Sequence, residues 1–239
     1  MIEASLETAI AANLAAARAR IAAAAIRAGR PPSAVRLIAV SKTFGPGHVL
    51  AAMAAGQRDF GENRVQEALP KIAACAAASP RWHLIGHLQS NKARKSVGPF
   101  DCLHSIDSLD LLRRLDVIAQ EQARDLDVLV QVDLAGEATK SGAPPDEARA
   151  MLDEAARCRR VGVGGLRLMP PFFDDVERVR PYFRRLRAFR DEEAARGISP
   201  AHLAELSMGM SHDFEVAIEE GATMVRIGTA IFGSRTVAG

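Results

Sequence analysis

The 239-residue sequence has few residues of several kinds that mark particular classes of protein. Its three cysteines, Cys75, Cys102 and Cys158, are widely spaced and form no CxxC pair, which argues against a disulfide framework or a zinc site. The 31 basic and 29 acidic residues leave a net charge of +2, so no overall field points to nucleic acid or a membrane surface. The longest apolar stretches are rich in alanine and interrupted by arginine, so we expect no membrane-spanning segment.

The N-terminus has no basic region followed by an apolar core, so no signal peptide is predicted. An odd number of cysteines is typical of reduced thiols, and we therefore expect a cytoplasmic protein. Its apolar content of 48% is enough to bury one large core.

Lysine is also scarce, with five lysines against 26 arginines. Lys42 follows the short apolar run 35–40, which is typical of a strand buried on both faces, and Gly45-Pro46-Gly47 then turns the chain. The ordinary interpretation is a solvated residue at a strand end. The functional interpretation is an amine that forms an imine with a carbonyl, a reaction for which guanidinium cannot substitute.

Strand patterns alternate with helical patterns along the whole chain. A helix is expected over 2–28, and strands over 35–40, 58–60, 82–85, 101–106, 126–132, 161–168, 202–206 and 223–227. This alternation predicts an α/β fold, a single (β/α)8 TIM barrel with an extra N-terminal helix, spanning residues 1–239 as one domain. An open doubly wound sheet is the alternative, but Gly162-Val-Gly-Gly165 is followed by more strand and two prolines, not by a helix.

In a barrel, all strands end at one rim, so the residues after each strand are expected to meet there. The predicted rim residues are Lys42, Asn63, His83, Gly86, Ser105, Asp133, Met169, Ser207, Arg226, Gly228 and Thr229.

The loops after the last two strands, 207–211 and 226–229, have the features of a phosphate site. Gly209 and Gly228 allow close backbone approach, while Ser207, Ser211 and Thr229 offer hydroxyls. We expect helices to begin at Ser211 and Thr229, where free N–H groups favour an anion. Plain helix caps and turns would have the same sequence.

A phosphate site facing one lysine points to a ligand with both a phosphate and an aldehyde. Pyridoxal 5′-phosphate is such a ligand, and an imine-forming lysine is its usual anchor. A sugar phosphate is the other candidate, although the rim has few carboxylates, such as Glu62 and Asp133, to bind its hydroxyls.

Two further patterns are weaker. His83 and His87 are four residues apart, but Gly86 and a strand-to-loop setting break the helical face that zinc ligation needs, so no metal ligand is predicted. The basic segment 91–95 is short and has no interleaved aromatic residues, which favours a solvated helix over nucleic-acid binding.

Several motifs resemble those of a known family, in order along nearly the whole chain. They are Leu37-Ile-Ala-Val-Ser-Lys-Thr43, Gln57-Arg-Asp-Phe-Gly-Glu-Asn63, Trp82-His-Leu-Ile-Gly86, Leu88-Gln-Ser-Asn-Lys92, His104-Ser-Ile-Asp107, Lys140-Ser-Gly142, Leu206-Ser-Met-Gly-Met-Ser211 and Val225-Arg-Ile-Gly-Thr-Ala-Ile-Phe-Gly233. The sequence resembles the pyridoxal phosphate homeostasis proteins, single-barrel relatives of the N-terminal domain of alanine racemase.

The resemblance implies a role for each candidate site residue. Lys42 would carry the aldimine with pyridoxal 5′-phosphate, Arg226 would face the pyridine nitrogen, and Asn63 would lie near the cofactor. The phosphate would be held by Ser207, Gly228 and Thr229, and Lys140 would be a secondary lysine. The sequence departs from the family pattern at Arg64, Asp133, Arg167 and His212.

The family resemblance implies a part in vitamin B6 homeostasis and delivery, with effects on amino-acid and keto-acid pools and apo-enzymes as recipients. The alternative is a pyridoxal-phosphate-dependent amino-acid racemase. Racemisation needs a base on each face of the substrate, and in alanine racemase the second base is a tyrosine from a partner subunit.

Two features of the sequence favour a carrier over a racemase. The single tyrosine, Tyr182, falls in the helix after the sixth strand, and the chain ends at Gly239, before any second domain. An arginine at the ring nitrogen would also leave that nitrogen unprotonated and weaken the electron sink. We therefore expect a cofactor carrier without catalytic residues, and a monomer because no extra domain is present.

Overall fold

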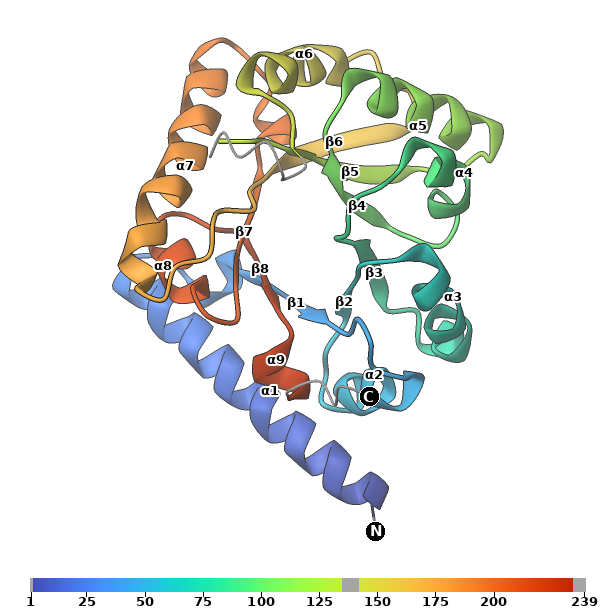
Figure 1. Cartoon of the computed structure of the whole chain (residues 1–239), viewed down its shortest axis with the longest axis vertical. Helices are drawn as coiled ribbons and strands as arrows, with labels where there is room; N and C mark the ends of the chain where they lie inside the picture. Colours follow the sequence, from blue (N-terminus) through green and yellow to red (C-terminus); the bar gives the residue numbers. More distant parts are fainter. Residues whose placement is uncertain (1, 135–141, 234–239) are drawn as a thin grey trace.

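The computed structural model describes residues 2–134 and 142–233, and their strands form one closed barrel (Figure 1). The eight strands are β1 (Arg36–Val40), β2 (Asp59–Glu62), β3 (Arg81–Leu84), β4 (Cys102–Ile106), β5 (Leu126–Gln131), β6 (Val161–Arg167), β7 (Glu205–Met210) and β8 (Met224–Ile227). Each strand pairs in parallel with the next, and β8 returns to β1, where Arg226 lies opposite Ile38. The (β/α)8 barrel expected from the sequence is confirmed.

Helices surround the ring of strands (Figure 1). They are α1 (Ile2–Arg27), α2 (Pro46–Ala54), α3 (Val65–Ala74), α4 (Ala93–Ser96), α5 (Leu109–Glu121), α6 (Pro145–Ala155), α7 (Arg180–Ala195), α8 (Phe214–Glu219) and α9 (Thr229–Phe232). Pro46 and Pro145 lie in first turns, where a missing N–H leaves no helical bond unmade. Ser108 caps α5 by accepting a hydrogen bond from the Leu111 N–H.

The N-terminal helix α1 lies along the outside of the barrel and packs against α2, α8 and α9 (Figure 1). Its segment Ser5–Arg27 is long and apolar enough to cross a membrane by length and composition alone, which differs from our expectation for the sequence. However, its large apolar residues, such as Ile10 and Leu14, are buried against the barrel helices, and Arg20 pairs with Glu215 at 2.9 Å. Packing on the barrel therefore accounts for the apolar face of α1.

The apolar core has two parts. The larger part fills the space between the strands and the helices. A small separate cluster inside the barrel consists of Ile38, Cys102, Leu129 and Met224. The barrel interior also contains buried polar side chains, which the candidate site uses.

The end of the barrel differs from the sequence-based expectation at β7. The predicted strand 202–206 is shifted, because His202 lies in a 3-10 turn and the strand continues through Met210. Gly209, at φ +92°, makes this possible, since a Cβ there would lie 2.6 Å from the Ala217 side chain. Ser211 does not cap α8 as predicted; the N-cap residue is Asp213.

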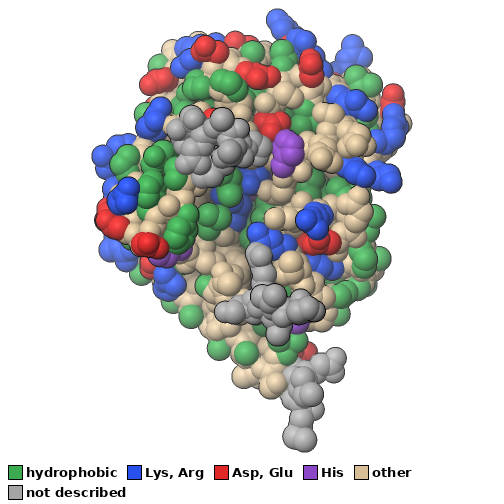
Figure 2. Space-filling model, in the orientation of Figure 1, with side chains coloured by type: hydrophobic (Ala, Val, Ile, Leu, Met, Phe, Trp, Pro, Cys, Tyr) green, Lys and Arg blue, Asp and Glu red, His purple; other side chains and the backbone are tan. Residues whose placement is uncertain are grey.

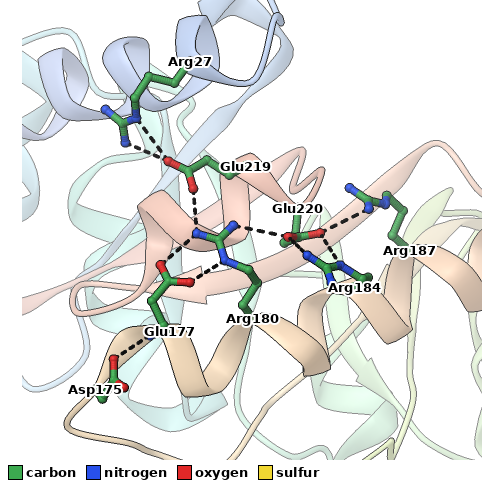
Figure 3. A network of polar contacts seen from close by, with 8 residues as sticks. All are labelled: Arg27, Asp175, Glu177, Arg180, Arg184, Arg187, Glu219 and Glu220. Carbon is green, nitrogen blue, oxygen red and sulfur yellow. Dashed lines mark hydrogen bonds and ion pairs between the residues drawn. The ribbon is translucent and has the colours of Figure 1, made fainter.

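A network of ion pairs fixes α8 between α7 and α1 (Figure 3). Glu220 accepts hydrogen bonds or ion pairs from three arginines of α7, which are Arg180, Arg184 and Arg187. Glu219 pairs with Arg180 at 2.8 Å and with Arg27 of α1 at 3.0 Å. Since α8 follows β7 directly, the network also holds the loop 211–213 at the mouth of the barrel.

Candidate functional site

A cavity of about 320 Å³ opens at the carboxyl ends of the strands. Figure 2 looks onto this face and shows basic side chains inside the hollow near its middle. Five of the predicted site residues line the cavity, namely Lys42, Asn63, Arg226, Gly228 and Thr229. The other lining residues are Val40, Phe44, Ile85, Arg167, Met169, Phe172, Met210, Ser211, His212, Asp213 and Gly233.

A tight turn places Lys42 at the cavity. The Phe44 N–H donates to the Ser41 carbonyl at 3.1 Å, so Lys42 and Thr43 are the two central residues of a β-turn. Thr43 has φ +72°, a conformation that is strained for a β-branched residue. The Phe44 ring packs against Phe232 of α9, with the ring centroids 5.4 Å apart, and this contact connects the turn to α9.

A buried ion pair stabilises this turn. Lys71 of α3 donates to Glu62 Oε1 at 2.7 Å and to the Ser41 carbonyl at 2.8 Å, and the Ser41 hydroxyl donates to the same carboxylate at 2.6 Å. Burial raises the pKa of Glu62, against the hydrogen bonds from Lys71 and Ser41. The pair therefore fixes the peptide that precedes Lys42. Sequence reasoning missed it, although Glu62 lies within the Gly-Glu-Asn63 motif.

Asn63 is held by a close approach of two backbone segments. A Cβ on Gly86 would lie 2.0 Å from the Asn63 carbonyl oxygen, so only glycine fits there. The Gly86 carbonyl accepts a hydrogen bond from the Ser105 hydroxyl at 2.6 Å. Asn63 is thereby positioned at the rim by the loop after β3, which strand β4 holds through Ser105.

The loops after β7 and β8 meet at the cavity, next to the end of β1. The Gly228 N–H donates to the Ser211 hydroxyl at 3.1 Å, which leaves the hydroxyl proton of Ser211 available to an anion. A Cβ on Gly228 would lie 3.3 Å from the Val40 carbonyl, so the loop packs closely on β1. In the first turn of α9 the Ile231 N–H donates to the Gly228 carbonyl at 2.9 Å, while the Thr229 and Ala230 N–H groups precede any acceptor that the helix can supply. These N–H groups and the Ser211 hydroxyl are donors of the kind that suit an anion.

Ser207 is not part of this group of donors, which corrects its predicted place at the rim. Its side chain is fully buried in β7, where its hydroxyl accepts from Arg226 Nη1 at 2.7 Å and lies 3.0 Å from His104 Nδ1. The strand shift at β7 is the reason, because it moves the loop forward to Ser211. Arg226 also donates to the Leu168 carbonyl at 3.1 Å.

A chain of hydrogen bonds continues across the barrel from Ser207. His104 Nε2 lies 2.9 Å from His83 Nδ1, and His83 Nε2 lies 3.0 Å from the Asp59 carboxylate. Since the ionised carboxylate can only accept, His83 donates from Nε2, His104 donates to His83, and Ser207 donates to His104. With both imidazoles neutral, each of these hydrogen bonds then has one donor and one acceptor. Arg226 is the first donor of the series.

The surroundings of both histidines favour these neutral rings. Burial lowers the pKa of His83, with the Asp59 hydrogen bond opposing it. Burial lowers the pKa of His104 well below its usual range, and the nearby His83, Arg167 and Arg226 add to this effect.

The same histidines form the cluster with the spacing of a metal site, together with Cys102. The three ligand atoms lie within 4.8 Å of one another and are buried. However, both nitrogens of each ring already have hydrogen-bond partners, and burial raises the pKa of the Cys102 thiol far above its usual range. These donors fit a hydrogen-bonded core better than a metal ion. His87 lies apart, beside Asp107 at 3.2 Å.

The cavity carries an excess of positive charge that the sequence did not reveal. Lys42, Arg167 and Arg226 line it together with one carboxylate, Asp213. Asp213 accepts a hydrogen bond from the Met210 N–H at 2.6 Å, and burial raises its pKa. Burial lowers the pKa of Arg226 to about 10, which still leaves it protonated at neutral pH. The cavity thus combines a primary amine with an environment suited to an anion. Lys140 and Glu137 lie outside the described residues.

Comparisons with known proteins identify the family of this chain. The alanine racemase N-terminal domain family matches residues 10–236. A pyridoxal phosphate homeostasis protein of Aquifex aeolicus is 44% identical over 216 residues, which cover 90% of this chain and 94% of the relative. One from Escherichia coli K12 is 42% identical over 238 residues, covering 95% and 97%. The chain belongs to the pyridoxal phosphate homeostasis protein family.

Solved structures support the same assignment. PipY of Synechococcus elongatus PCC7942, with pyridoxal phosphate bound, has a TM-score of 0.81 and 42% identity, and the match covers 94% of this chain and all of PipY. An alanine racemase of Clostridium difficile 630 has a TM-score of 0.68 at 17% identity, with 56% of that chain covered, which shows a shared fold.

Proposed function

We propose that this chain binds pyridoxal 5′-phosphate in the cavity, with the Lys42 amine bonded to the aldehyde. The observation that carries the proposal is the geometry of one cavity, which is lined by Lys42 at the end of β1 and by the loops after β7 and β8, and β8 pairs with β1. The residues that line the cavity fit pyridoxal phosphate, because a primary amine can form an imine with its aldehyde, and cationic and hydroxyl side chains can bind its phosphate. PipY, a relative of 42% identity, has this cofactor bound.

The residues take distinct parts in binding. Ser211, Gly228 and Thr229 hold the phosphate, and Ser211 takes the place that we had expected for Ser207. Arg226 faces the pyridine nitrogen, and the hydrogen-bond chain through Ser207 fixes its orientation. Asn63 borders the ligand from the opposite side of the rim. When bound, the cofactor supplies a reactive aldehyde, and Lys42 keeps that aldehyde from other amines.

The proposed physiological role is to hold and deliver the cofactor as part of vitamin B6 homeostasis. An arginine that is protonated at neutral pH disfavours the pyridinium form at the ring nitrogen, which weakens carbanion chemistry. Tyr182, the one tyrosine of the sequence, lies on α7 and stacks on Phe173 at 5.9 Å, away from the cavity lining. The described cavity therefore offers no tyrosine as a second base for racemisation.

The wider setting follows from the same role. We propose that residues 1–239 act as one barrel domain, as a monomer, in the cytoplasm, and that apo-enzymes accept the cofactor. Reduced cysteines are consistent with that compartment, because Cys75, Cys102 and Cys158 are all free thiols.

A spectroscopic titration tests the proposal. Pyridoxal phosphate added to the wild type should produce the visible absorbance of an imine, and Lys42→Ala should abolish it while circular dichroism shows an intact fold. Lys95→Ala, which removes an exposed lysine, is the matched control and should keep the absorbance. Absorbance retained in Lys42→Ala would contradict the assignment, and conversion of L-alanine to a D,L mixture would contradict the carrier role.

A further inference from the structure

Arg167 is a buried arginine that has no ion-pair partner among residues 2–134 and 142–233. It ends β6, lines the cavity and is 5% exposed. Its Nε and Nη1 atoms are buried and have no hydrogen-bond acceptor among the residues that the structure describes. Unpaired donors on a buried cation are costly to a fold unless a ligand satisfies them.

The neighbours of Arg167 increase this cost. Burial lowers the pKa of Arg167 well below its usual range, the positive charge of Arg226 lowers it further, and Asp107 opposes both. Asp107 is engaged with His87 at 3.2 Å, and Asp213 accepts from the Met210 N–H. Arg167 therefore has no carboxylate of its own in the described chain.

Arg167 also differs from the other buried arginine of the cavity. Arg226 donates to the Ser207 hydroxyl, the Leu168 carbonyl and the Met169 sulfur, so the protein fixes its position. By contrast, Nε and Nη1 of Arg167 have no acceptor in the part of the chain that the structure describes. They lie on β6, whereas the proposed phosphate site is formed by the loops after β7 and β8.

We propose that Arg167 is the receptor for a small carboxylate that binds in the same cavity beside the cofactor. This proposal rests on the proposed function only in placing the carboxylate beside the cofactor, because the lack of an acceptor for Nε and Nη1 is a property of the described residues themselves. A planar guanidinium matches a carboxylate, which can accept two N–H bonds from it. A cavity of about 320 Å³ is near the lower limit for ligand sites, so a cofactor leaves room for a second ligand of only a few atoms.

Calorimetric titration of the full chain with propionate and with propionamide, its neutral counterpart, tests this proposal. We expect the wild type to bind propionate about tenfold more tightly than propionamide, because the amide has no charge and carries an NH2 donor in place of one acceptor oxygen. Arg167→Met should lose this preference, and Arg167→Lys should keep only part of it. Arg64→Met, which removes an exposed arginine paired with Glu67, should retain the preference.

The titration is run with and without pyridoxal phosphate, so that the two proposals fail separately. Loss of cofactor binding with carboxylate preference intact would contradict only the proposed function. Equal binding of propionate and propionamide by the wild type in both states would overturn the carboxylate site. L-alanine and L-lactate in the same assay distinguish an amino acid from a hydroxy acid as the natural source.

Thermal unfolding excludes a merely structural role. Without ligand, Arg167→Met should melt at a higher temperature than the wild type, because the variant removes an unpaired buried cation. Propionate should raise the melting temperature of the wild type but not of Arg167→Met. A lower melting temperature for ligand-free Arg167→Met would show that Arg167 is part of the fold, and would overturn the proposal.

Discussion

Ser207 and Ser211 are four residues apart, yet they serve different parts of the site. Ser207 is buried and orients Arg226, whereas Ser211 lines the cavity and accepts the Gly228 N–H. The difference arises from the single residue Gly209, whose positive φ lets β7 continue past Ser207 and pack on α8.

Substitution of Ser211 tests its proposed contact with the phosphate. A hydrogen bond to a charged group contributes roughly 1.5–3 kcal/mol, so Ser211→Ala should weaken pyridoxal phosphate binding by about tenfold or more. Pyridoxal, which has no phosphate, should bind both proteins equally. Absorbance titrations with the two vitamers measure this, with the exposed-site variant Ser79→Ala as control. An equal loss for both vitamers would contradict the contact.

The pair of Glu62 and Lys71 allows a double-mutant test at the same scale. Glu62→Gln would leave Lys71 charged and buried, which costs about 3–5 kcal/mol in the free energy of unfolding. Adding Lys71→Met should recover most of the lost unfolding free energy, because no buried charge then remains without a partner. Urea unfolding of the two single variants and the double variant measures the coupling. Independent, additive effects of the two substitutions would show that the pair does not act as a unit.

At the scale of elements, the hydrogen-bond chain joins five strands, from Asp59 on β2 to Arg226 on β8. These hydrogen bonds require neutral His83 and His104, and the pKa values of both histidines are lowered in the folded protein. The unfolded chain therefore binds more protons below pH 6.5, so this stability is present above pH 6.5 and is lost as the pH falls.

A pH series tests the histidine chain directly. Each proton taken up on unfolding gives a slope of about 1.4 kcal/mol per pH unit, so two histidines give at most about 2.7. Between pH 7.5 and 5.5, His104→Gln should reduce the fall in unfolding free energy, measured with urea, by about 1.4 kcal/mol, because one histidine fewer takes up a proton on unfolding. An unchanged slope in that variant would mean that His104 is not kept neutral by the fold.

The ion-pair network around α8 is the second element-scale feature (Figure 3). Glu220 has 5% side-chain exposure and three arginine partners, so Glu220→Ala should cost about 1–3 kcal/mol of stability. Glu177→Ala is the matched control. The Glu177 side chain is 59% exposed and pairs with Arg180, so this substitution should change the stability little. Equal melting temperatures for the two variants would show that burial does not strengthen the network.

At the scale of the whole molecule, the sequence predicted the features that depend on local patterns. Alternating strands and helices predicted the barrel, and the position of Lys42 after a buried strand predicted its place at the rim. Contacts between side chains of different strands were not predictable. The pairing of His83 with His104 depends on barrel register, and the burial of Arg167 depends on which face of β6 turns inward.

The central proposal is that the cavity binds pyridoxal phosphate through one amine and one anion site. The sequence has five lysines whose amines could form the imine. Borohydride reduction of the complex with pyridoxal phosphate, followed by mass spectrometry of the peptides, identifies which lysine carries the label. We expect the label on Lys42 at one per chain. Label on Lys71, Lys92, Lys95 or Lys140 with Lys42 unmodified would contradict the proposed site.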